Sequence, residues 1–438
     1  MRAGRFADWL YKWRFALFGI WLVHTFLIHY FKLGFLSWDG FGHRGAPIVE
    51  LYQHGSLGKE KFTEWSLVGY TPWIELVHIP FLYVFKLRGF IIGFPLLVFP
   101  LAVVAIYKLV NELTSDRRAA TFGAFAYAAI PMVNQQPFTG YIDFAVTGLL
   151  AYWIYAVLRM RTAERLIGPS IRLAIATLMF VMARSQGVYV IVVMFPILAY
   201  VMFCTREKFR IRTQHGKRLA LAIGLVVIGC APAIGLQIYK YYEYGSPVAP
   251  MQFSFLGVKI GHGVTMDTYL KYAGLGGSDL GSLAKGFFEG WVWHSGWPIG
   301  AFYASRHMAA GLLFLLALGL LPVFVRAVTR PEVAVIGAGL FVSLLSRDFA
   351  VPRWSYTIVI ALAIVLGRSM SALAGTYAER AAPRKWYRPV FWVALAIMAV
   401  HLLRPEVDML QMRNNGYISP RLNVTGSKRF IEGHEVAV

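Results

Sequence analysis

The sequence is poor in charge and in cysteine. Only 15% of its 438 residues are Asp, Glu, Lys or Arg, whereas a soluble domain carries about 25%. Its two cysteines, Cys204 and Cys230, are too few for a disulfide framework and indicate no metal site. The composition therefore argues against a soluble domain and against a small, disulfide-stapled secreted one.

The sequence contains many long apolar runs. Hydrophobic residues make up 58% of the chain, and many runs approach the ~20 residues that cross a bilayer core as a helix. The first run is too long and too aromatic for a signal peptide, so we expect a retained first helix. The sequence predicts an all-α polytopic bundle with about eleven spans, at residues 15–36, 90–107, 119–133, 141–158, 173–184, 187–203, 219–239, 308–325, 333–346, 355–372 and 389–403. Ser185 and Gln186 alone separate the fifth span, a short limb, from the sixth.

The basic residues indicate orientation. The net charge is +21, which would suit nucleic acid if the cations were spread over one soluble surface. They gather instead in short segments that fall on one side of the predicted membrane, at Arg159/Arg161/Arg165/Arg172, Arg206/Lys208/Arg210/Arg212/Lys217/Arg218 and Arg380/Arg384/Lys385/Arg388. The positive-inside rule then predicts a cytoplasmic N-terminus, contact with anionic membrane lipids and no nucleic-acid partner.

The opposite side holds the long loops of this single membrane domain, residues 1–438. They are the first outer loop, 37–89, a large outer loop, 240–307, and a short outer tail, 404–438. Within the first, residues 46–52 and 72–80 are apolar but too short to span, so we expect helices at the membrane interface or packed over the bundle. A shorter outer turn is expected at 134–140. Because the cytoplasmic turns are short and basic, any chemistry is predicted on the outer face.

Three short motifs lie at span ends on that face. Asp39 follows the first span, in Ser37-Trp38-Asp39-Gly40. Asp143 lies one or two turns into its span, where an unpaired carboxylate would be costly, and Arg353 precedes Trp354-Ser355-Tyr356 at the mouth of a late span. In this order the motifs resemble the GT-C superfamily, polytopic glycosyltransferases that include the protein mannosyltransferases and the aminoarabinose transferases.

The resemblance implies a function and its partners. It implies an inverting glycosyltransferase that moves a sugar from a polyprenyl-phosphate donor to a lipid, glycan or protein acceptor. Frequent Arg and the compact chain favour a bacterial inner membrane with a periplasmic active site. The chain lacks the soluble C-terminal domain of larger members, and Asp39-Gly40 stands where they carry paired acidic residues. This leaves open whether a divalent metal ion takes part; no other cofactor is expected.

Such a transfer needs a base for the acceptor hydroxyl, and Asp39 is the candidate. Alternatively, Asp39 is an ordinary solvated carboxylate in a loop or turn. Asp143 could orient the acceptor, share a metal ion with Asp39, or pair with a buried Arg, and we favour a supporting or structural role. His43 would share a face with Asp39 if the segment were helical, but the glycines around it argue against a helix, so a metal pair there is a weak signal.

The leaving phosphate needs fixed positive charge on the same face. Arg suits phosphate because its guanidinium can bind two oxygens at once. Each Arg could instead extend to the lipid headgroups. The lysines could instead be solvated loop charges, and the histidine could instead pack among aromatic residues. The candidates for donor-phosphate binding are Arg353, Arg347, Arg184, His294, Lys59 and Lys61.

Two other classes of function compete with this one. An O-antigen ligase or polymerase also has a large outer loop late in the chain, but relies on Arg and His rather than on a first-loop Asp. A transporter or flippase predicts charges near the bilayer midplane and matched halves. Most charges here lie at span ends, and no internal repeat is apparent.

Overall fold

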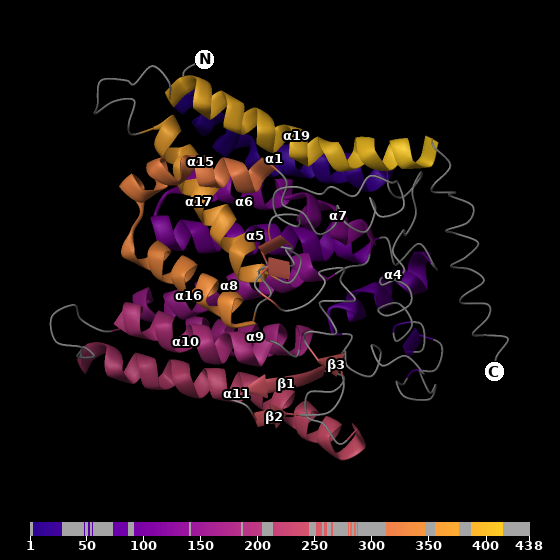
Figure 1. Cartoon of the computed structure of the whole chain (residues 1–438), viewed down its shortest axis with the longest axis vertical. Helices are drawn as coiled ribbons and strands as arrows, with labels where there is room; N and C mark the ends of the chain where they lie inside the picture. The colour runs from indigo at the N-terminus through magenta and orange to yellow at the C-terminus, as the bar shows by residue number, and fades with distance from the viewer. Residues whose placement is uncertain are drawn as a thin grey trace.

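The computed structural model is a helical bundle whose helices run across the molecule (Figure 1). A few single positions apart (48, 51, 52 and 55, and six between 279 and 287), the described residues are 3–28, 73–85, 92–139, 142–184, 187–203, 213–244, 251–255, 258–260, 264–265, 312–346, 355–375 and 387–414.

The bundle helices follow the chain in order. The first half contributes α1 (Ala3–Ile28), the π-helical turn η5 (Phe94–Val98) that continues into α5 (Phe99–Thr114), α6 (Arg117–Ala129), α7 (Pro131–Thr139), α8 (Asp143–Thr162), α9 (Ile167–Ala183) and α10 (Gly187–Phe203). The second half contributes α11 (Thr213–Tyr244), α15 (Leu312–Ala327), α16 (Arg330–Ser346), α17 (Tyr356–Ala374) and α19 (Tyr387–Asn414). The first predicted loop holds η3 (Glu75–Val77) and α4 (His78–Phe85).

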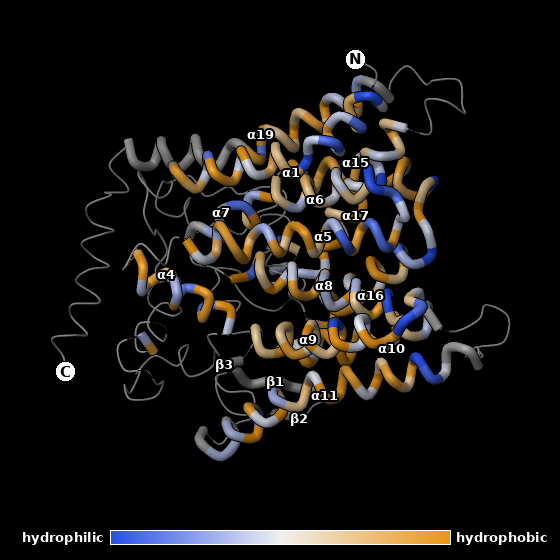
Figure 2. Tube along the Cα trace, turned by 180° about the vertical axis from the view of Figure 1, so that it is seen from behind, coloured by the Kyte–Doolittle hydropathy of each residue, from blue (hydrophilic) through white to orange (hydrophobic). Residues whose placement is uncertain are grey.

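This is a multi-pass membrane protein. Each of the eleven predicted spans contains a described helix, and apolar residues run along most of them (Figure 2). Within the described residues, the segments long and apolar enough to cross a bilayer are Phe94–Thr114, Asp143–Thr162, Gly216–Tyr239 and Tyr356–Ala374, with shorter apolar helices around them. The predicted all-α membrane bundle is confirmed.

Among the boundaries that differ from those predicted are those of the third and fifth spans. The third span ends early, because Ile130 is extended (φ −64°, ψ 121°) before Pro131. A new helix, α7, then covers residues 134–139 of the turn predicted at 134–140. A residue before proline avoids the helical region, and proline itself suits a first helical position. The predicted short limb at 173–184 is also wrong. Helix α9 begins at Ile167, so its 17 residues match those of α10.

The later part of the chain adds two features. Helix α19 continues to Asn414, beyond the expected span end at residue 403. The large predicted loop contains a small sheet, in which β1 (Met251–Phe255) pairs antiparallel with β2 (Val258–Ile260) and parallel with β3 (Val264–Thr265). The alternating run Met251-Gln252-Phe253-Ser254-Phe255 carries the strand signal, which the sequence prediction read as loop.

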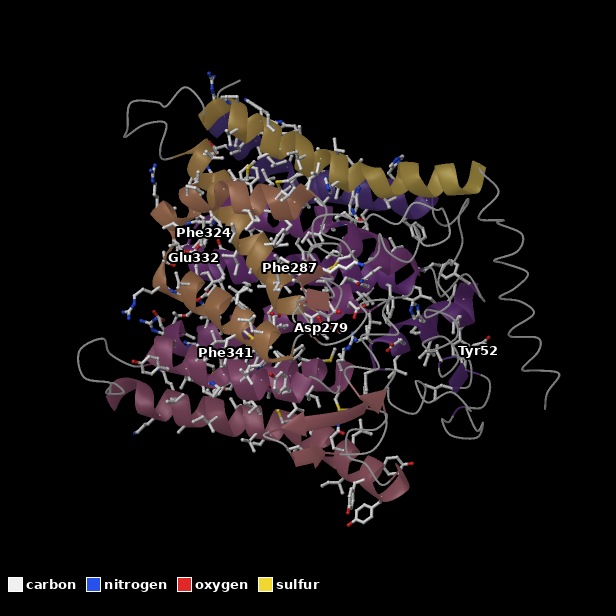
Figure 3. All side chains as sticks on the ribbon, viewed as in Figure 1. Tyr52, Asp279, Phe287, Phe324, Glu332 and Phe341 are labelled. Atoms are coloured by element: carbon white, nitrogen blue, oxygen red, sulfur yellow. The ribbon has the colours of Figure 1, made fainter. Side chains whose placement is uncertain are left out.

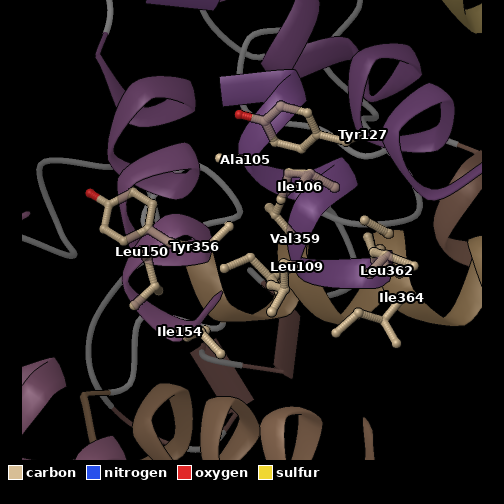
Figure 4. Close-up of a cluster of buried hydrophobic side chains, with 14 of the residues drawn as sticks. Ala105, Ile106, Leu109, Tyr127, Leu150, Ile154, Tyr356, Val359, Leu362 and Ile364 are labelled. Carbon is tan, nitrogen blue, oxygen red and sulfur yellow. The ribbon is translucent and has the colours of Figure 1, made fainter. Parts of the chain in front are cut away.

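Helix α17 lies at the centre of the bundle and is buried along almost its whole length. Its apolar residues pack with those of α5 and α8, as in the cluster around Leu109, Ile154 and Val359 (Figure 4). It approaches α6 very closely, because Gly367 faces the backbone of Ala119 and Gly123 where any Cβ would collide. Small residues permit such contact between membrane helices. The close packing of α17 therefore holds the residues at its ends in fixed positions.

The bundle has two distinct ends. The Arg368 end carries a network in which the Arg368 guanidinium donates to the Ala327 carbonyl at 2.8 and 3.0 Å and lies 3.8 Å from Glu332 and 4.0 Å from Asp116. Asp116 also caps α6 by accepting from the Arg118 amide at 2.8 Å. Glu332 marks this end in Figure 3, and Tyr52 lies on the opposite side of the molecule. The end of α17 opposite Arg368, where the hydroxyl of its first residue, Tyr356, contacts Asp143, is called the Asp143 end below.

Candidate functional site

Asp143 is the first residue of α8 rather than one or two turns inside it, which corrects the predicted depth. Its side chain is buried, with 5% of the residue exposed. A carboxylate at a helix N-terminus is favoured by the unpaired amides and by the helix dipole. The helix N-terminus therefore offsets part of the free-energy cost of burying this charge.

Side chains from neighbouring helices fix the start of α8. The Gln136 Oε1 atom of α7 accepts from the Phe144 amide at 2.7 Å, which satisfies one of the first-turn donors. The Tyr127 hydroxyl of α6 donates to the Phe144 carbonyl at 2.6 Å. The Thr147 hydroxyl donates back to the Asp143 carbonyl at 2.8 Å. Two neighbouring helices, together with Thr147 of α8 itself, thus hold the backbone at Asp143 in place.

Arg184 is the partner of Asp143. It follows the last residue of α9 in an extended conformation (φ −155°, ψ 132°), and its guanidinium Nη1 donates to Asp143 Oδ1 in a buried ion pair. The side chains are 9% and 6% exposed. A cation at a helix C-terminus is as well placed as a carboxylate at an N-terminus. Each charged side chain therefore interacts favourably with the dipole of its own helix as well as with the charge of its partner.

Tyr356, the first residue of α17, contacts both members of the pair. Its hydroxyl donates to Asp143 Oδ1 at 3.2 Å, and Arg184 Cζ lies 5.4 Å from the centre of its ring. The second contact is a cation–π geometry. The ring belongs to the buried cluster drawn in Figure 4, close to Leu150 of α8. Three helix ends, from α8, α9 and α17, converge on this buried polar cluster, the Asp143–Arg184–Tyr356 triad.

An aromatic row connects the first predicted loop to the triad. The His78 ring of α4 lies 4.3 Å from Phe94, and Phe94 lies 5.8 Å from Phe144, the neighbour of Asp143 in the chain. Gly93 allows this docking, since a Cβ there would meet His78 Nδ1 at 2.9 Å. Phe94 also begins the π-helical turn η5, a distortion often found near functional sites.

The two loop stretches predicted as helices are partly described. The second is helical as η3 and α4. In the first, Ile48, Leu51 and Tyr52 are helical, and the Tyr52 ring lies 4.9 Å from that of Tyr83 in α4. The first stretch therefore contacts α4, the helix that continues the second stretch beyond residue 80. Whether they lie at a membrane interface stays a prediction.

Apart from Asp143 and Arg184, all of the candidate residues lie outside the described part of the chain. Those residues are Asp39, His43, Lys59, Lys61, His294, Arg347 and Arg353. Their predicted roles, including the metal hypothesis for Asp39 and His43, stay predictions. Of the candidates, the structure describes Asp143 and Arg184, and it brings these two together.

Tyr356 and Gln136 are two residues of this site for which no role was predicted from the sequence. Tyr356 belongs to the quoted late motif, and Gln136 stands in the polar stretch between the third and fourth spans. The available signal was a polar side chain at a span end on the same face as Asp143. That signal is common at span ends, so it could not distinguish these two residues from their neighbours.

With this geometry the chain can be compared with known proteins. No protein-family model matches it, and no curated protein matches its sequence. Its fold does match solved structures, and the class they define is the polytopic membrane protein of GT-C fold.

Two solved structures represent that class. ArnT from Cupriavidus metallidurans bound to undecaprenyl phosphate has a TM-score of 0.51 and 14% identity, over 90% of this chain and 74% of its own. The archaeal oligosaccharyltransferase AglB from Archaeoglobus fulgidus, in complex with an inhibitory peptide and a dolichol-phosphate, has a TM-score of 0.52 and 14% identity. That match covers 91% of this chain and 56% of AglB. Identities this low establish the fold alone, and the GT-C fold expected from the sequence is confirmed.

Proposed function

We propose that the protein is an inverting glycosyltransferase that moves a sugar from a polyprenyl-phosphate donor to a lipid, glycan or protein acceptor. The observation that carries the proposal is the buried Asp143–Arg184–Tyr356 triad at three converging helix ends in a GT-C fold. Support comes from the structural neighbours, one bound to undecaprenyl phosphate and the other to a dolichol-phosphate.

The proposed reaction is a single displacement at the anomeric carbon. The acceptor oxygen attacks that carbon from the face opposite the phosphate, and the bond to the phosphate oxygen breaks with its electron pair. Asp39 takes the acceptor proton. Arg353, Arg347 and Arg184, with Lys59, Lys61 and His294, supply positive charge to the departing phosphate. Asp143 has a supporting role. In the alternative mechanism a divalent metal ion is bound by Asp39 and His43, and this alternative predicts that transfer depends on added metal.

The Asp143 end is proposed to face the periplasm of a bacterial inner membrane. Arg159 and Arg161 lie in the last turn of α8, at the opposite end of this helix from Asp143, and the positive-inside rule assigns that basic end to the cytoplasm. A polyprenyl-linked donor remains in the membrane, so a site at the end of the spans receives it directly from the bilayer.

The test is sugar transfer by the full chain in lipid nanodiscs, with labelled undecaprenyl-phosphate sugars and membrane lipids as acceptors. Asp39→Asn is expected to lower the transfer rate by about 10²- to 10⁴-fold, the usual contribution of a general base. Full activity of this variant together with loss on replacing outer-loop Arg or His would favour the O-antigen ligase class instead. Transbilayer movement of the lipid without transfer would favour a flippase.

A matched control is Asp279→Asn. Asp279 is exposed in the second predicted outer loop and accepts from the Ser282 amide at 2.9 Å. Hydrogen bonds from Ser282 hold the pKa of Asp279 below its ordinary value, so the group is charged at neutral pH. This variant removes the same charge as Asp39→Asn, and transfer is expected to stay at the wild-type rate.

A further inference from the structure

Arg184 is already engaged by a carboxylate. Asp143 and Arg184 form a buried pair, and the charges of the two side chains sum to zero. A guanidinium paired in this way attracts a phosphate less strongly than one without a carboxylate, because the incoming anion must share it with Asp143. The proposed phosphate role of Arg184 therefore has to include its partner.

The proposed reaction makes this partner useful. A sugar–phosphate–polyprenyl donor is a phosphodiester with one negative charge. The product, a phosphate monoester, carries about −1.5 to −2 at neutral pH. A strong cationic site therefore holds the product more tightly than the donor, and release of the product would limit turnover.

We infer that Asp143 and Tyr356 are positioning residues that set how tightly Arg184 binds the polyprenyl-phosphate product: Asp143 weakens this binding, and the Tyr356 hydroxyl strengthens it by weakening the Asp143–Arg184 pair. The inference rests on the proposed function, in which the donor phosphate approaches Arg184. Asp143 competes with the phosphate for the guanidinium, so Arg184 stabilises the departing charge without retaining the product. No bond is made or broken by Asp143 or Tyr356, and the acceptor proton goes to Asp39.

Tyr356 adjusts this competition from two sides. Its hydroxyl donates to the same Asp143 oxygen that receives Arg184, which draws negative charge away from the ion pair. Its ring lies beside the guanidinium and attracts the cation whether or not the carboxylate is engaged. Loss of the hydroxyl alone should therefore strengthen the Asp143–Arg184 pair and weaken phosphate binding.

The test measures binding of undecaprenyl phosphate, with undecaprenol as the neutral control, to the full chain in nanodiscs. Asp143→Asn keeps the shape of the side chain and removes its charge. It is expected to bind undecaprenyl phosphate about tenfold more tightly, because Arg184 no longer shares its positive charge with a carboxylate. In transfer assays kcat and KM for the donor should fall together. Tyr356→Phe should bind the phosphate severalfold more weakly, and undecaprenol binding should not change in either variant.

The opposite signs of the two variants separate this role from a structural one. If both variants weaken binding of undecaprenyl phosphate and undecaprenol alike, the triad only holds the fold and the inference is wrong. Should Asp143→Asn not fold, Tyr356→Phe decides, and unchanged phosphate binding by a folded Tyr356→Phe protein overturns the inference. Failure of the wild-type protein to bind undecaprenyl phosphate or transfer any sugar is a different result, which contradicts the proposed function itself.

Discussion

At the scale of single residues, the triad shows what buried charge requires. Asp143 and Arg184 were each recognisable in the sequence because a charged residue at an apolar span is costly without a partner. Their mutual pairing was not predictable, since they are 41 positions apart in the sequence and the turns between α8 and α9 set which helix ends meet. Tyr356 was harder still to identify, because a tyrosine at a span end usually indicates only the membrane interface.

Replacing Arg184 tests whether the pair is as deeply buried as described. Arg184→Gln leaves the Asp143 charge without its cation, so the free energy of unfolding should fall by about 3–5 kcal/mol. Thermal unfolding in detergent measures this as a large drop in Tm. A matched control is Asp8→Asn, which breaks the exposed Asp8–Arg118 pair, where Asp8 is 57% and Arg118 35% exposed. That change should cost at most about 1 kcal/mol, and equal losses in the two variants would contradict the description.

At the scale of elements, apolar runs located the spans but not their ends. Helix boundaries depend on local chemistry, such as the extended Ile130 before Pro131 and the left-handed Ser115 that turns the chain into the Asp116 cap of α6. These caps can be read from sequence only after the fold shows where the chain must turn. The small sheet at β1–β3 was missed because a short alternating run was expected to be loop.

The docking of α4 onto the bundle gives a prediction at this scale. Gly93→Ala places a Cβ 2.9 Å from His78 Nδ1 and 3.3 Å from the Val77 carbonyl, so the His78 ring must move and the contact of α4 with Phe94 is disturbed. Sugar transfer should fall by about tenfold or more if the first loop carries the base, since small displacements of a reacting group cost up to about 10²-fold. Gly19→Ala in α1 is the control, because nothing lies within 4 Å of its added Cβ. Unchanged transfer by Gly93→Ala would show that α4 does not position the reacting groups.

At the scale of the whole molecule, composition and charge pattern were sufficient for the class. The scarcity of charge and the recurring apolar runs predicted a polytopic bundle, and the order of three short motifs predicted the GT-C fold that the solved structures match. The geometry of the site could not be predicted in the same way. It depends on how α8, α9 and α17 pack, which no local pattern specifies.

Orientation in the membrane is a prediction at the same scale. Single cysteines can be introduced at two exposed positions, Asp279 and Arg165, in a chain lacking Cys204 and Cys230. The cysteine at 279 should react with a membrane-impermeant maleimide added to intact spheroplasts. The one at 165 should react only after the membrane is permeabilised. The reverse pattern would place the Asp143 end in the cytoplasm and contradict the proposed donor.

The most direct test of the central claim is an electron cryomicroscopy map of the full chain with undecaprenyl phosphate in nanodiscs. The account predicts phosphate density at the Asp143 end, within hydrogen-bond distance of the Arg184 guanidinium and between Asp39 and Arg353. Phosphate density at the Arg368 end, beside Asp116 and Glu332, would contradict it.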